Sequence, residues 1–154
     1  MIDPRYRFFL VVLAANLICA TAARAGLGDG TQGVVADAKI LHGVVHAVSY
    51  PLFDIHEINA ASGLRVREYA NRDGIVFAVT WAGAVQPDLQ QLLQGSFAEY
   101  YQLRSALTRP GLQRVLRIVA ADLVVETSGH LRAYSGRAYL PAFIPAGASV
   151  ADLR

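Results

Sequence analysis

The residues best suited to binding chemistry lie around a predicted turn at Thr127-Ser128-Gly129. If strands run over residues 123–126 and 130–134, strand alternation gathers a carboxylate, an imidazole, a guanidinium and a phenol on one face. The strand that follows extends this face with a second guanidinium and a second phenol. Such a mixture suits binding to a peptide, a glycan or another protein, the alternative being an ordinary solvated sheet face. The candidate partner-binding residues are Glu126, His130, Arg132, Tyr134, Arg137 and Tyr139.

Other polar residues could support acid–base catalysis. Asp54 and Glu68 would lie across from each other on neighbouring strands, where two close carboxylates raise one pKa and can serve as acid and base. Together with His130 they define the alternative function, a small hydrolase or isomerase with dispersed site residues. His56 and Glu57 are adjacent, but strand alternation sends adjacent side chains to opposite faces and argues against a shared site.

Metal and cofactor chemistry lack their usual motifs in this sequence. His42 and His46 have the spacing of two ligands on one helix face, yet no Glu follows His42 as it does in hydrolytic zinc sites. No serine stands in a G-x-S-x-G turn, and no Gly-rich loop precedes a helix with Lys. We therefore predict no metal and no cofactor. Trp81 and the Tyr100-Tyr101 pair fall on apolar stripes and are predicted to be core residues.

The first 25 residues have the three parts of a secretory signal peptide. Arg5 and Arg7 give a positive start, an apolar run follows, and Ala23-Arg24-Ala25 offers the small residues that signal peptidase recognises. The apolar run of about 16 residues is shorter than the roughly 20 of a spanning helix. We predict cleavage after Ala25, export to the periplasm or beyond, and no membrane span afterwards; the alternative is a retained anchor.

Cleavage would leave a neutral, cysteine-free domain. It removes three of fourteen basic and one of twelve acidic residues, so eleven of each remain and nothing favours nucleic-acid binding. Cys19 would be lost with the signal, and Ile18 before it does not fit a lipoprotein signal. The domain must then be stable without an internal disulfide.

The mature chain divides into a lead and a domain. Residues 26–50 begin with a small, polar, turn-like run and show no clear period, so we treat them as a flexible or irregular lead. Strands follow over 53–58, 64–69 and 75–81, joined by turns that each carry a late Gly. With Ile58 opposite Leu64 and Ala70 opposite Ile75, Glu57 lies across from Arg65. The apolar face then collects Ile58, Leu64, Val66, Ile75, Phe77, Val79 and Trp81.

One helix and a second set of strands complete the prediction. The helix opens at Pro87-Asp88 and ends before Thr108-Arg109-Pro110-Gly111. Gly95 inside it either permits close approach to the sheet or breaks the helix in two. Its apolar stripe comprises Leu89, Leu92, Leu93, Phe97, Tyr100, Tyr101 and Leu103. Strands over 115–120, 123–126, 130–134 and 137–140 follow, with a bend or bulge at Gly136.

These elements predict an α+β domain over residues 51–154. Strands, a helix and strands again favour an antiparallel sheet of about five or six strands, with one main amphipathic helix packed on one face.

Three blocks of this sequence together resemble a known family. The first block is Ser62–Tyr69 together with Gly74–Trp81. The second runs from Pro87–Leu93 to Phe97 and Tyr100. The third comprises Asp122–Val125, Ser128–Ala133 and Gly136–Pro141. The chain resembles the exported proteobacterial proteins grouped as domain of unknown function 2844, over roughly residues 50–154. The resemblance implies export and one compact domain, and no activity.

Three functions follow as hypotheses. The first is a non-enzymatic exported module that binds another exported protein or an envelope component. The second is the dispersed-site hydrolase or isomerase, and the third is an assembly accessory of a secretion or surface system.

Overall fold

The computed structural model describes residues 26–107 and 115–154. The predicted signal peptide with Cys19 lies outside these residues, as does the predicted helix stop at Thr108–Gly111. Among the described residues, no helix is both long and apolar enough to cross a membrane.

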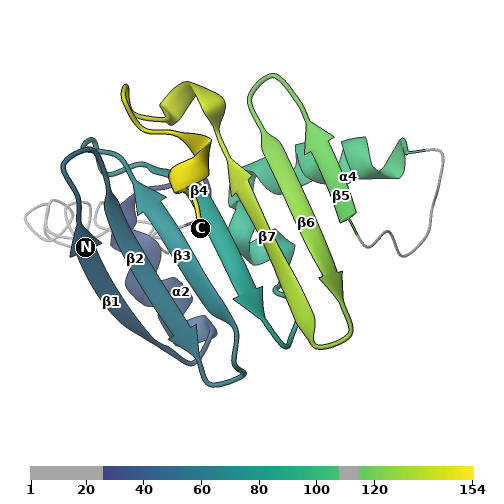
Figure 1. Ribbon diagram of the computed structural model, residues 1–154, viewed down its shortest axis with the longest axis horizontal. Helices are drawn as coiled ribbons and strands as arrows, with labels where there is room; N and C mark the ends of the chain where they lie inside the picture. The colour runs from purple at the N-terminus through teal and green to yellow at the C-terminus, as the bar shows by residue number, and fades with distance from the viewer. Residues whose placement is uncertain (1–25, 108–114) are drawn as a thin grey trace, which may run out of the picture.

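Seven antiparallel strands form a single sheet (Figure 1). In chain order they are β1 (Gly43–Ser49), β2 (Asp54–Ala60), β3 (Arg65–Ala70), β4 (Val76–Gly83), β5 (Val115–Val119), β6 (Val124–His130) and β7 (Ala133–Tyr139). Their order in the sheet is β1-β2-β3-β4-β7-β6-β5, so two meanders meet where β4 pairs with β7. The α+β class is confirmed, but the prediction of five or six strands was too low.

The first three predicted strands are confirmed as β2, β3 and β4, with a different register. Ile58 pairs with Val66 rather than Leu64, and Glu57 consequently pairs with Arg67 rather than Arg65. This shift of two residues preserves the faces, because strand side chains alternate with a period of two. The turns between these strands place Gly63 and Gly74 at φ 81° and 77°, as the late glycines predict.

A bulge in β4 overturns part of the predicted apolar face. Tyr69 pairs with Ala78 but Ala70 pairs with Val76, so Phe77 is an extra residue on its strand. The extra residue places Phe77 on the same face as its neighbour Ala78, so Phe77 lies on the opposite face from Val76 and Val79. The prediction that Ile75 and Phe77 share a face with Val79 was therefore wrong.

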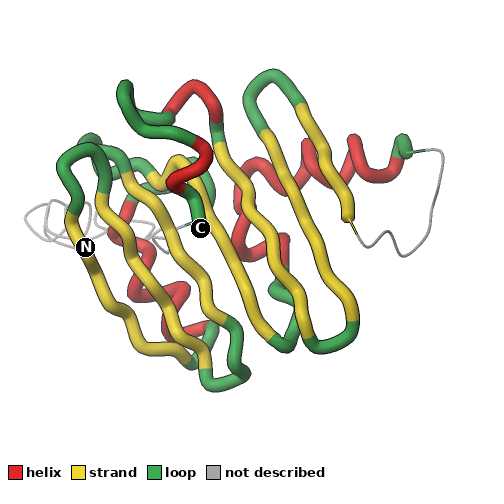
Figure 2. Tube along the Cα trace, viewed as in Figure 1, coloured by secondary structure: helices red, strands yellow, loops and turns green. Residues whose placement is uncertain are grey.

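In the described part of the chain, three α-helices, rather than one main helix, cover a single face of the sheet (Figure 2). Their bounds are α2 (Val34–Ile40), α3 (Leu89–Leu93) and α4 (Phe97–Ser105), and the 3-10 turn η3 (Gln94–Ser96) separates the last two. The Asp88 carboxylate caps α3 by accepting from the backbone N–H of Gln90, 2.8 Å away. The predicted helix thus exists but breaks in two at Gln94, whose φ of 45° is not helical.

Residues 26–50 are not an irregular lead. The backbone N–H of Gly28 donates to Val76 and that of Leu27 to Leu92, so the segment is tied to β4 and α3. The short turn η2 (Thr31–Gly33), α2 and β1 follow. Sequence periodicity missed this helix because its seven residues make barely two turns, too short for an apolar stripe to recur.

The main core lies between the sheet and the helices. It contains Trp81 and Tyr100, as predicted, whereas Tyr101 is 61% exposed and lies off the core. Gly136 pairs with Trp81, and a Cβ at this glycine would lie 2.3 Å from the indole ring. Gly136 therefore gives the indole room to lie across β7. The predicted bulge at this glycine is absent, because β7 pairs with β4 and β6 through Gly136 without a register shift.

A second, smaller core lies on the opposite, open face of the sheet. There the chain after β7 turns through η4 (Pro141–Phe143) and η5 (Val150–Asp152) and lies in front of the middle strands (Figure 1). Leu153 from this segment packs with Phe53, Tyr69, Phe77 and Tyr139. The three rings of Phe53, Tyr69 and Phe77 have centroids 5.9–6.4 Å apart.

A candidate binding groove on the open sheet face

The hairpin that carries the predicted binding face closes later than expected. β6 continues through Thr127-Ser128-Gly129 to His130, and the turn falls at Leu131-Arg132, where Arg132 has φ 64°. Tyr134 then pairs with Gly129, which sends its side chain to the helix face. The prediction that Tyr134 and Arg132 share a strand face with Glu126 was wrong.

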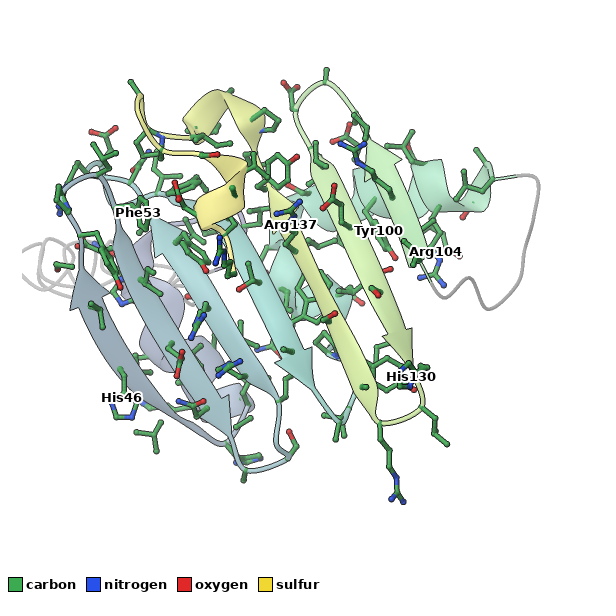
Figure 3. The ribbon with its side chains drawn as sticks, in the orientation of Figure 1. His46, Phe53, Tyr100, Arg104, His130 and Arg137 are labelled. Carbon is green, nitrogen blue, oxygen red and sulfur yellow. The ribbon has the colours of Figure 1, made fainter. Side chains whose placement is uncertain are left out.

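The other four predicted residues do share the open face. Glu126 pairs with Arg137, and the Arg137 Nε lies 2.6 Å from the Glu126 Oε2. Tyr139 is buried beside them in the smaller core, and His130 lies exposed at the far end of β6. Figure 3 shows His130 near the hairpin end and Arg137 nearer the middle of the sheet. Four of the six candidates therefore remain on one face, but only Glu126 and Arg137 touch through an ion pair.

A row of polar side chains crosses the whole open face. Directly paired positions on successive strands are His46, Glu57, Arg67, Thr80, Arg137, Glu126 and Arg117. Arg67 pairs with Glu57 at 2.6 Å, and Arg117 joins Arg137 on Glu126 at 2.9 Å. Oppositely charged side chains are therefore paired on both sides of the neutral Thr80, between β2 and β3 and among β7, β6 and β5, and they attract these neighbouring strands.

The segment after β7 lies over the middle of this row. Arg67 Nη1 donates to the carbonyl of Arg154 at 2.6 Å, and Arg137 Nη1 donates to that of Val150 at 3.0 Å. The Tyr69 hydroxyl donates to the Arg154 carbonyl at 2.7 Å and accepts from the Arg154 backbone N–H at 3.0 Å. Thr80, which lies between Arg67 and Arg137 in the row, is buried, and the segment divides the open face into two parts.

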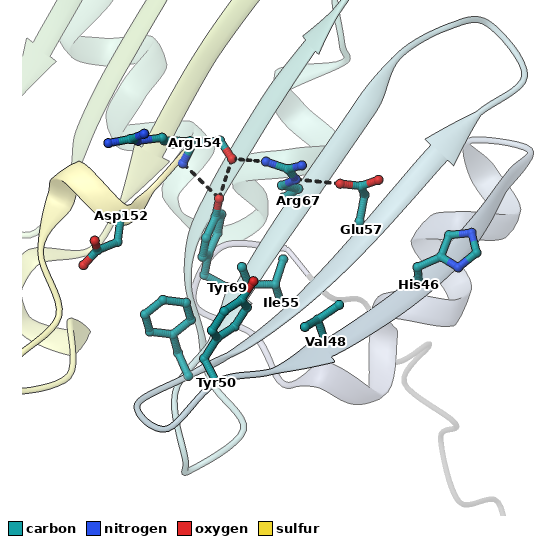
Figure 4. A pocket seen from close by; sticks show the side chains of 10 residues that line it. His46, Val48, Tyr50, Ile55, Glu57, Arg67, Tyr69, Asp152 and Arg154 are labelled. Carbon is teal, nitrogen blue, oxygen red and sulfur yellow. Dashed lines mark hydrogen bonds and ion pairs between the residues drawn. The ribbon is translucent and has the colours of Figure 1, made fainter.

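A groove lies on the part of the open face that belongs to β1, β2 and β3. We call it the β1–β3 groove. It encloses about 610 Å³, a size that small-molecule and peptide side-chain sites often have. Its lining residues are His46, Val48, Tyr50, Phe53, Ile55, Glu57, Arg67, Tyr69, Asp152 and Arg154. Figure 4 shows Asp152 and Arg154 at one end of the groove and His46 at the other.

The groove combines an apolar wall with a neutralised polar row. Val48, Ile55 and the rings of Tyr50 and Phe53 supply the wall, with the two rings 5.7 Å apart. Hydrogen bonds from Asn59 and Arg67 hold the pKa of Glu57 below its ordinary value, and the Glu57 carboxylate raises the pKa of Arg67. Both side chains are therefore ionised at neutral pH and largely satisfy each other.

A buried acid with a strongly raised pKa lies on the helix face, away from this groove. Glu68 is fully buried, and neither of its carboxyl oxygens has a hydrogen-bond partner among the residues described. Burial, and to a lesser extent the Asp37 carboxylate of α2, raise the pKa of Glu68 to about 9 from 4.5. Glu68 is thus a neutral carboxylic acid at pH 7.

The acid–base residues considered from sequence do not meet. Asp54 pairs with Ala70 rather than Glu68 and forms an ion pair with Arg72 at 3.2 Å. His130 lies on the opposite face from Glu68, on a strand three places away from β3 in the sheet. His56 and Glu57 face opposite sides of β2, as alternation predicts. The predicted opposition of Asp54 and Glu68 was wrong because the register differs by two residues.

Metal ligands do not gather in the part of the chain that the structure describes, where no group of three or more candidate side chains could hold an ion. His42 and His46 lack the helical relation that their spacing offers, because His42 lies in the turn after α2 and His46 lies in β1.

Sequence reasoning missed the β1–β3 groove itself. Three of its residues, His46, Val48 and Tyr50, lie in the segment treated as irregular, and two others, Asp152 and Arg154, come from the end of the chain. The three valines Val44, Val45 and Val48 were the available signal, because β-branched residues favour strands.

Residues 23–153 match the family model described as protein of unknown function DUF2844. The chain belongs to this family. The match begins before Gly26, so α2 and β1 are part of the domain of unknown function 2844 rather than a lead in front of it. The chain matches no curated protein and no solved structure.

Proposed function

We propose that this protein is a non-enzymatic binding module of the cell envelope. Its N-terminal segment directs it to the periplasm, and its β1–β3 groove holds a short segment of another exported protein or envelope component. The observation that carries the proposal is the groove itself, an apolar wall and a polar row on a sheet face that the helices leave open.

The chemistry of the groove indicates what kind of partner fits. Its four charged side chains are two acids and two bases, and Glu57 is paired with Arg67. A strongly charged ligand would gain little there. An apolar or aromatic side chain would instead bury against Tyr50 and Val48, which are 46% and 50% exposed. Burying such a side chain typically stabilises a complex by about 1–3 kcal/mol.

The hydrolase or isomerase hypothesis gains no support from the geometry. Asp54 does not pair with Glu68, because the strand register differs from the predicted one. His130 lies on the opposite face from Glu68 and on a different strand. Acid–base catalysis needs at least two such groups within hydrogen-bond reach of one substrate.

Site-specific photo-crosslinking in intact cells tests the proposal. A benzophenone amino acid replaces Tyr50 in one strain and Tyr101 in a control strain. Both tyrosines are exposed, but Tyr101 lies on α4 at the opposite face. We expect one dominant adduct from position 50 that is absent from position 101, and its loss when Ile55→Asp places a charge in the groove wall.

The identity of the adduct is read by mass spectrometry. A single exported protein or envelope component at position 50 supports the proposal. Identical adduct patterns from both positions, or no adduct from position 50, would overturn it.

A further inference from the structure

Within the described residues, the outer edge of β1 lacks the features that keep sheet edges apart. β1 reads Gly-Val-Val-His-Ala-Val-Ser, without Pro, Lys or an acid, and it pairs with β2 over seven residues without a bulge. Val44 and Val48 are 63% and 50% exposed on it. The opposite edge strand β5 carries Arg117 in an ion pair with Glu126. Long, apolar, unprotected edges are templates for pairing with another strand.

Two hydrogen bonds define which backbone groups of β1 point outward. The Tyr50 N–H donates to the Phe53 carbonyl, and the Ala61 N–H donates to the His42 carbonyl. Hydrogen-bonded pairs alternate along an antiparallel ladder, so the even-numbered residues of β1 bond to β2. The N–H and C=O groups of Gly43, Val45, Ala47 and Ser49 are therefore directed away from the sheet, toward the open edge.

We propose that β1 is a homodimer interface, in which two copies of this chain pair their β1 strands antiparallel about a twofold axis at His46. This register places Gly43 opposite Ser49 and Val45 opposite Ala47 of the second copy. It uses all four outward-directed residues of each strand. A shift of two residues in either direction leaves at least one of them without a partner.

The side chains are self-complementary in the same register. Val44 lies opposite Val48 of the second copy on the open face, and small side chains meet on the helix face. The one polar side chain in the centre, His46, meets its own copy. No acid or permanently charged group is brought against its like, so a second copy fits this edge without repulsion.

The dimer would join two seven-stranded sheets into one continuous sheet. His46 and Val48 also line the β1–β3 groove, so the grooves of the two copies would lie side by side across the junction. The inference rests on the backbone of β1 and holds whatever the groove binds.

Cysteine scanning of β1 tests the register. The full-length chain is expressed, recovered from the periplasm and oxidised. In the proposed dimer the two His46 positions form a pair without backbone hydrogen bonds, with Cα atoms about 4.5 Å apart, a distance at which a disulfide forms. His46→Cys should give a covalent dimer in high yield. Val44→Cys should give none, since its two copies lie about 13 Å apart along the strands.

Sedimentation of the unmodified protein and of proline variants tests the edge itself. At micromolar concentrations we expect the mass of two chains. Ala47→Pro removes an outward N–H that the monomer does not use and should weaken association about thirtyfold, for two lost hydrogen bonds per dimer. Val119→Pro is the matched control: the Ala120 N–H donates to the Leu123 carbonyl, so position 119 directs its N–H outward from β5.

A dimer that survives Val119→Pro and dissociates with Ala47→Pro supports the proposal. It is overturned if the protein sediments as a single chain. It is also overturned if Val44→Cys and His46→Cys crosslink equally, or if Val119→Pro rather than Ala47→Pro dissociates the dimer. If circular dichroism shows that Ala47→Pro does not fold, the crosslinking of Val44→Cys and His46→Cys still tests the dimer. Both cysteine substitutions replace exposed side chains, so neither should disturb the fold.

Discussion

Among single residues, Glu68 is a carboxylic acid that lies entirely out of contact with water. Its carboxyl is buried on the helix face near Asp37, and its pKa is raised to about 9. In the unfolded chain the same group loses its proton near 4.5. Between these two values the unfolded state is deprotonated and the folded state is not, so rising pH favours unfolding.

We therefore predict that the free energy of unfolding falls as pH rises from 5 to 8, and that Glu68→Gln removes most of this decline. The contribution of Glu68 is fully present below about pH 4.5 and is lost progressively toward pH 9. The isosteric amide cannot ionise, so the variant should gain on the order of 4 kcal/mol over the parent between pH 5 and 8. Urea unfolding at several pH values measures it.

Glu57→Gln serves as the control for that experiment. The pKa of Glu57 is lowered, so its contribution is present above the ordinary carboxyl range and is lost only as the solution becomes acidic. The variant should leave the slope between pH 5 and 8 unchanged. An unaltered slope in Glu68→Gln would mean that Glu68 is already ionised in the folded protein.

At the scale of elements, the break between α3 and α4 depends on one strained residue. Gln94 has φ 45° and ψ −118°, a region that residues with a Cβ rarely adopt. The break lets α3 bury Leu92 and Leu93 while α4 buries Tyr100, although the two helices take different paths. The Gly95 beside it has no special φ and open space around it, so the neighbouring Gln carries the turn.

Gln94→Gly should therefore stabilise the protein. Glycine adopts this conformation without the Cβ clash, and relief of such strain is typically worth about 1 kcal/mol. Gln90→Gly, inside α3, should instead destabilise by about 1 kcal/mol, because there glycine only adds freedom to the unfolded chain. Thermal unfolding of both variants distinguishes relief of strain at position 94 from loss of helix propensity at position 90. A loss of stability in Gln94→Gly would show that the Gln94 side chain has a packing role.

The elements predicted correctly are those in which local chemistry and long-range packing agree. The β2–β3 and β3–β4 hairpins have glycines at positive φ and strands that bury one side, so turn residues and alternation lead to the same structure. The turn of the β6–β7 hairpin was predicted in the wrong place because Ser128-Gly129 has the composition of a turn. The actual turn contains Arg132 at positive φ and no glycine. Cross-strand pairing with the rest of the sheet outweighed local turn preference there.

The candidate site could be predicted only in part, for a reason of geometry. Glu126 and Arg137 are close in sequence and face each other across one hairpin, so alternation finds them. The β1–β3 groove draws on β1 and on the segment after β7, whose positions depend on strand order and on packing over Tyr69 and Phe77. Neither determinant has a local signature in the sequence.

For the molecule as a whole, one short segment holds the two meanders together on the open face. Arg67 belongs to the first meander and Arg137 to the second, and both donate to backbone carbonyls of residues 150–154. Within the sheet, the two meanders pair where β4 meets β7, and their side chains share both cores. The segment is therefore a second connection between them, and it should bind or detach as one unit.

This arrangement predicts that Arg67→Gln and Arg137→Gln are not additive. Once either substitution loosens the segment, the other arginine loses part of its contact with it as well. The double variant should therefore lose less unfolding free energy than the sum of the two single variants, by about 0.5–1 kcal/mol.

Arg72 is the control, because it bonds to Asp54, Pro51 and Tyr50 at a different site. Arg72→Gln combined with Arg137→Gln should be additive within about 0.5 kcal/mol. Urea unfolding of the singles and doubles provides both cycles. Additivity in the Arg67–Arg137 cycle would mean that each arginine stabilises only its own strand pair and that the segment does not connect the meanders.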